Sequence, residues 1–146
     1  LINPQLSFYR ASRLPVYATS HVYTGRADSS LDADLEDVAF CDMPWILNSA
    51  DDGDYLQTSI AEYWPASATR YGRFHALGID AWRVIPYVDQ LESSLMGAYQ
   101  GATGNLTLDS NRQIHRSLNW AHFQQGLPVR LQSRAEVMDS PLAGIP

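Results

Sequence analysis

The segment that most constrains the fold is residues 101–126, GATGNLTLDSNRQIHRSLNWAHFQQG, because it holds two strand patterns and a turn within 26 residues. Residues 106–108 form a short β-prone run, and residues 109–111 supply Asp, Ser and Asn, which favour turns. Residues 114–123 resume an extended pattern rich in β-branched and aromatic side chains, and residues 125–126 end it. These patterns predict two strands joined by a tight turn.

Residues 14–20 and 38–43 are predicted to be strands of a sheet that is buried on both faces. The second strand ends at Pro44, and the first carries a nearly continuous apolar run made of Leu14, Val16, Tyr17 and Ala18. Parallel strands carry such runs because crossover helices cover both faces of the sheet. We therefore expect both segments to be central strands.

Helical spacing appears in three places. Residues 6–11 read as the end of a helix, and a short amphipathic helix is expected after the acidic residues 51–54. A longer helix is expected over residues 69–91, weakened by Gly78 and kinked by Pro86. Its apolar stripe comprises Phe74, Leu77, Ala81, Trp82, Ile85, Val88 and Leu91, and we expect Trp82 in the core.

The remaining segments are predicted to be connections, one further strand and a tail. Residues 24–37 form an acidic loop without periodicity, which we expect to be exposed to solvent. Residues 92–102 read as a loop with a helical turn, and residues 127–131 as the last strand. Residues 132–146 read as a flexible tail, which leaves residues 1–131 as the folded portion.

Composition excludes several classes of partner. The chain has 146 residues and a formal net charge of −6, and all ten of its basic residues are scattered arginines. Nucleic acid and anionic membrane surfaces need clustered basic residues, so neither is an expected partner. No apolar run of about 18 residues is present, so we expect no bilayer-spanning segment.

The residues that could carry catalysis or bind metal do not form a recognised pattern. The four histidines lack the spacing of metal ligands, and His115 and His122, seven apart on one predicted strand, would point to opposite faces. The acidic run from Asp32 lacks the Gly and Glu that a calcium loop requires. Cys41 reads as core packing, and no nucleophile and base stand in a known arrangement. We therefore expect no catalytic residues, metal or cofactor.

Three segments carry a resemblance to a known family. Residues 14–23, 76–82 and 101–126 occur in the order found in the LpoA (LppC) family of penicillin-binding-protein activators, which the chain resembles over residues 1–131. The resemblance implies an α/β fold, part of a two-lobed type I periplasmic-binding-protein-like domain with mainly parallel sheets flanked by helices. It also implies a noncatalytic regulator of peptidoglycan synthesis that binds and activates a class A penicillin-binding protein. Such a protein lies in the periplasm, held to the outer membrane by an N-terminal lipid anchor that this chain lacks.

The resemblance also suggests a cleft between the two lobes. Ser20, His21 and Tyr23 follow the carboxyl end of a predicted parallel strand, where open α/β sheets bind ligands. Asp42 and Trp45 lie in a segment that resembles the family's crossing between lobes. These five residues are the candidate ligand-binding residues, and the alternative function is a solute-binding or sensing module that closes on a small metabolite.

The start of the chain suggests a fragment. Residue 1 is not Met, and the first residues read as the inside of a helix. The strands at residues 14–20 and 38–43 need neighbours on both sides, which the family supplies from upstream sequence. We therefore expect that the chain alone is not a self-sufficient domain, and that its ordered structure needs a second segment, a swapped partner or an abbreviated lobe.

Overall fold

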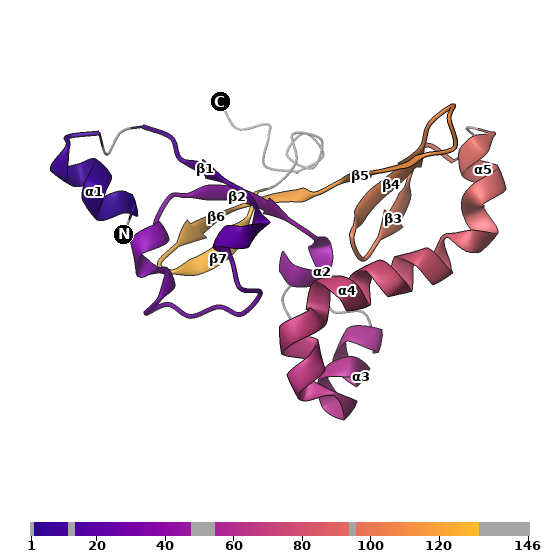
Figure 1. The fold of residues 1–146 in the computed structure, drawn as a ribbon, viewed down its shortest axis with the longest axis horizontal. Helices are drawn as coiled ribbons and strands as arrows, with labels where there is room; N and C mark the ends of the chain where they lie inside the picture. Colours follow the sequence, from indigo (N-terminus) through magenta and orange to yellow (C-terminus); the bar gives the residue numbers. More distant parts are fainter. Residues whose placement is uncertain (1, 12–13, 48–54, 94–95, 132–146) are drawn as a thin grey trace, which may run out of the picture.

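The computed structural model describes residues 2–11, 14–47, 55–93 and 96–131, which form two small sheets and a long helix that leads toward the second of them (Figure 1). The first sheet has the order β1-β2-β6-β7, and the second has the order β3-β4-β5. The strands are β1 (Tyr17–Ala18), β2 (Ala39–Asp42), β3 (Tyr99–Gly101), β4 (Gly104–Leu108), β5 (Ile114–Ser117), β6 (Asn119–Gln124) and β7 (Leu127–Arg130).

The helices lie beside and between the sheets. Helix α4 leads from the middle of the molecule toward the second sheet, and α3 packs against it (Figure 1). The α-helices are α1 (Ile2–Phe8), α2 (Pro44–Leu47), α3 (Tyr55–Tyr63), α4 (Pro65–Arg83) and α5 (Val88–Glu92). Short 3-10 turns are η1 (Ser20–Val22), η2 (Asp32–Leu35) and η4 (Ile85–Tyr87). None of the helices in the described ranges is long and apolar enough to cross a membrane.

The α/β class is confirmed, but the expectation of mainly parallel sheets is wrong for this chain. Only β1 and β2 pair in parallel among the described strands, whereas β2 pairs antiparallel with β6, and β6 with β7. The second sheet is wholly antiparallel. The reason is connectivity, because β6 returns to the first sheet from the opposite direction and a tight turn at Gln125 and Gly126 then reverses the chain.

The segment predicted as one strand over residues 114–123 changes sheets. Its first part, β5, pairs with β4 as far as Ser117, and its second part, β6, begins to pair with β2 at Asn119. Leu118 between them packs on the cluster around Trp45. The two histidines placed on one strand by the sequence, His115 and His122, therefore belong to different sheets.

The long predicted helix is interrupted at the expected proline. Helix α4 ends at Arg83, Pro86 lies in the 3-10 turn η4, and α5 continues the path. The missing N–H and the ring of proline are incompatible with an uninterrupted helix, so the predicted kink is confirmed. Gly78 does not interrupt α4, which is kinked instead at Tyr71, where the backbone is non-helical (φ −121°, ψ 22°).

The expected burial of Trp82 is wrong. Its side chain is 77% exposed, and Phe74 on the same stripe of α4 is 71% exposed. The residues that α4 buries are Gly72, Ala76 and Asp80, so the helix packs through a different face from the predicted stripe. Leu91, at the far end of the predicted stripe, does reach a core, because α5 packs against β4.

Three hydrophobic clusters hold the described fold together. The first lies on β2 and β6, where Phe40 and Phe123 stack with ring centroids 4.9 Å apart and Tyr23 packs on both. The second joins α2 to α4 through Trp45 and Ala76. The third joins α4 and α5 to the second sheet through three buried residues, namely Val84, Leu91 and Leu106.

Three further burial predictions need correction. Strand β1 is two residues long, lies at the edge of the described sheet and exposes Tyr17, so residues 14–20 are not a central strand buried on both faces. Strand β2, by contrast, lies between β1 and β6 as expected of a central strand. Cys41 is only partly buried. Asp32 is buried inside the acidic loop, whereas the predicted tail at 132–146 lies outside the described residues.

Candidate functional site

An arginine joins α4 to the end of the first sheet. The Arg73 guanidinium donates from Nε to Oδ1 of Asp42 at 3.1 Å and from Nη2 to Oδ2 at 2.5 Å. Asp42 is the last residue of β2 and is almost completely buried, whereas Arg73 is about one third exposed. A two-point contact of this kind is the strong form of the arginine–carboxylate pair.

The same guanidinium binds the turn that follows β1. Nη2 donates to the backbone oxygens of Ser20 at 3.1 Å and Tyr23 at 2.9 Å. The Asp42 carboxylate also accepts a hydrogen bond from the backbone N–H of Met43 at 2.8 Å. Strand β2, the turn η1 and helix α4 therefore meet at one charged centre.

The structure brings together three of the five predicted ligand-binding residues. Ser20, Tyr23 and Asp42 surround the Arg73 guanidinium, although Ser20 and Tyr23 contribute backbone oxygens there. The ring of His21 is exposed, and its Nδ1 lies 3.3 Å from Oγ1 of the neighbouring Thr19. Arg73 is not predictable from the sequence as a site residue, because an arginine in the middle of a helix carries no local sign of a partner 31 residues away.

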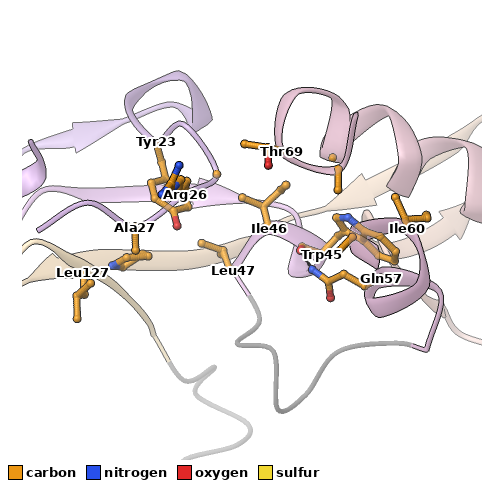
Figure 2. Close-up of a pocket in the computed structure, with 15 residues that line it drawn as sticks. Tyr23, Arg26, Ala27, Trp45, Ile46, Leu47, Gln57, Ile60, Thr69 and Leu127 are labelled. Atoms are coloured by element: carbon orange, nitrogen blue, oxygen red, sulfur yellow. Dashed lines mark hydrogen bonds between the residues drawn. The ribbon is translucent and has the colours of Figure 1, made fainter. Parts of the chain in front are cut away.

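A cavity of about 510 Å³ opens beside this centre (Figure 2). Tyr23 and Arg26 line it from the first sheet's side, and Trp45, Gln57 and Ile60 line it from α2 and α3. The Gln57 side chain donates to the backbone oxygen of Trp45 at 2.8 Å, which fixes α3 against α2. The fifth predicted residue, Trp45, therefore belongs to the cavity wall together with Tyr23.

The cavity wall includes one titratable group with a shifted pKa. Burial raises the pKa of the Tyr23 phenol above its ordinary value of 10.0, and the carboxylates of Asp32 and Asp42 raise it further. The positive charge of Arg73 acts in the opposite direction. The phenol therefore stays neutral at physiological pH and keeps its O–H hydrogen-bond donor.

A second charged centre fixes the carboxyl-terminal part of α4. Asp80 is buried, and its Oδ1 accepts from the backbone N–H of Ala102 at 2.7 Å. Its Oδ2 accepts from the backbone N–H of Thr103 at 2.7 Å and from the Thr103 hydroxyl at 2.6 Å. Gly101 leaves room for this carboxylate, because a Cβ at that position would collide with it.

The Asp80 contact links two of the segments that carry the family resemblance. Asp80 lies in residues 76–82, and its partners lie in residues 101–126. The sequence alone gives no sign that these two segments touch. Asp80 lies outside the predicted apolar stripe, so no local pattern in the sequence indicated this contact.

The remaining polar groups form small, separate contacts. His115 Nε2 lies 2.9 Å from Oδ2 of Asp109, and His75 Nε2 lies 2.9 Å from the Ser67 hydroxyl. Within the described ranges, no three His, Cys, Asp or Glu side chains are grouped so that they could hold a metal ion.

Known proteins resemble this chain along most of its length. A family model described as "LppC putative lipoprotein" matches residues 1–126. The protein called "Penicillin-binding protein activator LpoA" of Edwardsiella piscicida is 31% identical over 134 residues, which are 90% of this chain and 19% of the relative. The protein of the same name from Yersinia pseudotuberculosis serotype O:1b (strain IP 31758) is 30% identical over 133 residues, 90% of this chain and 20% of the relative. The chain therefore spans about a fifth of the length of these curated relatives.

Solved structures share the fold. The structure named "LpoA (YraM) C-domain from Haemophilus influenzae, a regulator of PBP1A" matches with a TM-score of 0.71 and 24% identity, over 90% of this chain and 40% of that chain. The "Crystal structure of a putative branched-chain amino acid ABC transporter from Rhodospirillum rubrum" matches with a TM-score of 0.53 and 22% identity, over 85% of this chain and 39% of that chain. These likenesses confirm an α/β fold of the periplasmic-binding-protein-like kind.

Proposed function

The chain belongs to the LppC family, and from this membership we propose that it is part of a noncatalytic regulator that binds and activates a class A penicillin-binding protein. The observation that carries the proposal is the 31% identity over 90% of the chain to a protein named as a penicillin-binding protein activator. The role proposed for the whole protein is stimulation of peptidoglycan synthesis.

The geometry supports a binding module better than an enzyme. The conspicuous buried carboxylates, Asp42 and Asp80, are each held by several hydrogen-bond donors from distant parts of the chain. Carboxylates held in this way fix helix α4 in place, whereas a general acid or base needs access to a substrate proton. A structural role for both carboxylates fits a regulator that acts by presenting a surface.

The proposed location follows from the proposed function. A regulator of a class A penicillin-binding protein must reach the periplasm, and the family description names a lipoprotein. We therefore place the full-length protein in the periplasm, anchored to the outer membrane by a lipid at its N-terminus.

The domain assignment is part of the same proposal. Residues 1–131 would form the C-terminal portion of a periplasmic-binding-protein-like domain, and residues 132–146 a flexible tail. Deleting residues 132–146 from the full-length protein should leave both folding and activation unchanged. A deletion protein that folds but no longer activates would show that the tail belongs to the functional surface.

The direct test measures the partner's activity. Purified full-length protein is added to a class A penicillin-binding protein from the same organism, and glycan polymerisation and peptide crosslinking are followed with lipid-linked precursor. We expect faster synthesis and a saturable complex, and no synthesis by the regulator alone. Absence of both binding and stimulation would refute the proposal, and a matched addition of an unrelated lipoprotein controls for detergent and lipid effects.

One observation supports a second function, that of a solute-binding module. The cavity of about 510 Å³ is large enough for a small metabolite, and Tyr23 and Trp45 offer aromatic walls with a phenol donor. Ser20, His21, Tyr23, Asp42 and Trp45 remain the candidate ligand-binding residues in this alternative. A thermal-shift screen of amino acids and muropeptides on the complete domain tests it, because a ligand at 100 times its Kd adds about 2.7 kcal/mol to the free energy of unfolding. No shift across such a screen would leave the regulator as the better account.

A further inference from the structure

The polar groups that sequence analysis assigned to a ligand are already occupied by the protein itself. The Asp42 carboxylate and the backbone oxygens of Ser20 and Tyr23 all converge on one guanidinium, that of Arg73. Three acceptors that converge on a cation at the ends of two parallel strands resemble the polar end of a ligand pocket. Here the cation is a side chain from helix α4.

We infer that Arg73 takes the place of a ligand. Its guanidinium fills the polar end of the junction between the first sheet and α4, and it fixes the sheet against the helix without a bound solute. Proteins that close around a solute do so because the solute contacts both sides of a cleft and favours the closed state. Arg73 supplies such contacts permanently, because it is covalently part of α4. The arrangement of the first sheet and α4 is therefore independent of solute.

Arginine suits this task for chemical reasons. Its guanidinium stays charged at every physiological pH, and its planar fork can bind a carboxylate at two points while donating to further oxygens. The Nη2 atom lies within hydrogen-bond distance of Ser20, Tyr23 and Asp42 at once. A lysine side chain is shorter, and its ammonium is a point charge without the planar fork. It therefore cannot make all the contacts that the Arg73 guanidinium makes with Ser20, Tyr23 and Asp42.

The packing around Arg73 also favours one fixed arrangement. The preceding residue, Gly72, is buried against Ile46, and a Cβ there would lie 3.2 Å from the Ile46 Cδ1 atom. Helix α4 therefore lies very close to α2 at the point where Arg73 reaches the first sheet. The burial of Asp42 means that losing its partner leaves an uncompensated charge, which strongly favours rearrangement.

The test measures the distance between the two sides directly in the full-length protein. Spin labels are attached at Ala33→Cys in η2 and Glu62→Cys in α3, both exposed positions, after Cys41→Ser removes the native thiol. Pulsed electron paramagnetic resonance (double electron–electron resonance) then measures the distribution of distances between the two labels. With Arg73 intact we expect one narrow distribution that amino acids and muropeptides do not change. A solute that narrows or shifts this distribution would overturn the inference.

Substitutions at Arg73 supply the decisive comparison. Arg73→Ala should broaden the distribution, and millimolar guanidinium chloride, but not sodium chloride at the same ionic strength, should narrow it again. Arg73→Lys should remain broadened, since the ammonium cannot make all the contacts. The matched control is Arg70→Ala on an exposed part of the same helix, which should behave as the wild type.

The inference fails if Arg73→Ala and Arg70→Ala give the same distribution as the wild type. Where Arg73→Ala does not accumulate as folded protein, Arg73→Lys and Asp42→Asn decide the question. Unchanged distributions in both would overturn the inference, and broadening in both would support it. Activation of the penicillin-binding protein is measured separately, so that a failure of the proposed function does not decide the role of Arg73.

Discussion

Replacing Asp80 by Asn should open the turn between β3 and β4. The carboxylate accepts hydrogen bonds from the backbone N–H groups of Ala102 and Thr103 and from the Thr103 hydroxyl, at 2.6–2.7 Å. An amide keeps one acceptor oxygen and turns an NH₂ group toward at least one of these donors. The Asp80→Asn change therefore leaves the fold intact in outline while it breaks a buried contact at a defined place.

The expected magnitude follows from counting these bonds. The better amide orientation leaves one donor, the Ala102 N–H, without its acceptor, which costs about 1–3 kcal/mol, and weakens two bonds by about 1 kcal/mol each. Since an amide is less costly to bury than a carboxylate, part of this loss is offset. We expect a net loss of about 2–3 kcal/mol in the local opening free energy, or a roughly 30- to 150-fold rise in exchange rate.

Hydrogen exchange followed by mass spectrometry on the full-length protein measures this loss of local opening free energy segment by segment. Peptides covering residues 99–106 should lose protection, because the opening equilibrium governs exchange there. Thr103→Val should give a smaller loss of about 1 kcal/mol, since only the hydroxyl bond is removed. The control Asp89→Asn lies on the exposed face of α5 and should stay within about 0.5 kcal/mol. Equal protection in Asp80→Asn and Asp89→Asn would refute the argument.

Four further changes have defined outcomes. Gly104→Ala should lower the free energy of unfolding by about 2 kcal/mol or more in urea melts, because Gly104 has φ +136° and its Cβ would collide with β5. Gly78→Ala, with nothing within 4 Å of the added Cβ, should be neutral or slightly stabilising. Phe40→Ala should cost about 3–5 kcal/mol in the same assay, since Phe40 is fully buried and stacked, and a loss below about 1 kcal/mol would contradict the assigned core. The hydrogen bond from His115 holds the pKa of Asp109 below its ordinary value of 3.8. The ionised Asp109 therefore stabilises the folded state above pH 3.8, and this stabilisation is lost as the pH falls through the folded-state pKa. Asp109→Asn should therefore reduce the acid sensitivity of the melting temperature below about pH 4, and an unchanged acid profile would contradict this role.

Local patterns determined most of the elements of this fold. The turn at residues 109–111 forms as predicted, with the Asn111 and Gln113 backbone N–H groups donating to Oδ1 of Asp109. Pro86 breaks the long helix where its missing N–H requires. These predictions succeed because turn chemistry and proline geometry act within a few residues.

Patterns of apolar residues, in contrast, did not determine burial. Trp82 lies on the predicted apolar stripe and yet is 77% exposed. Periodicity identifies an apolar face of a helix, but it does not show whether another segment packs against that face. The same holds for Tyr17 on β1, which lies at the edge of the described sheet. Whether residues 1–146 fold alone stays a prediction, which expression of this segment and a cooperative melt would test.

The sequence by itself determined the family and the α/β class, because the order of the motifs and the types of side chain can be read along the chain. Tertiary structure alone decided what the cleft contains. Arg73 lies 31 residues from Asp42, and Asp80 lies 23 residues from Thr103, so no local pattern could pair them. Both pairings arise where α4 crosses from the first sheet toward the second, and the position of that crossing depends on packing between distant segments.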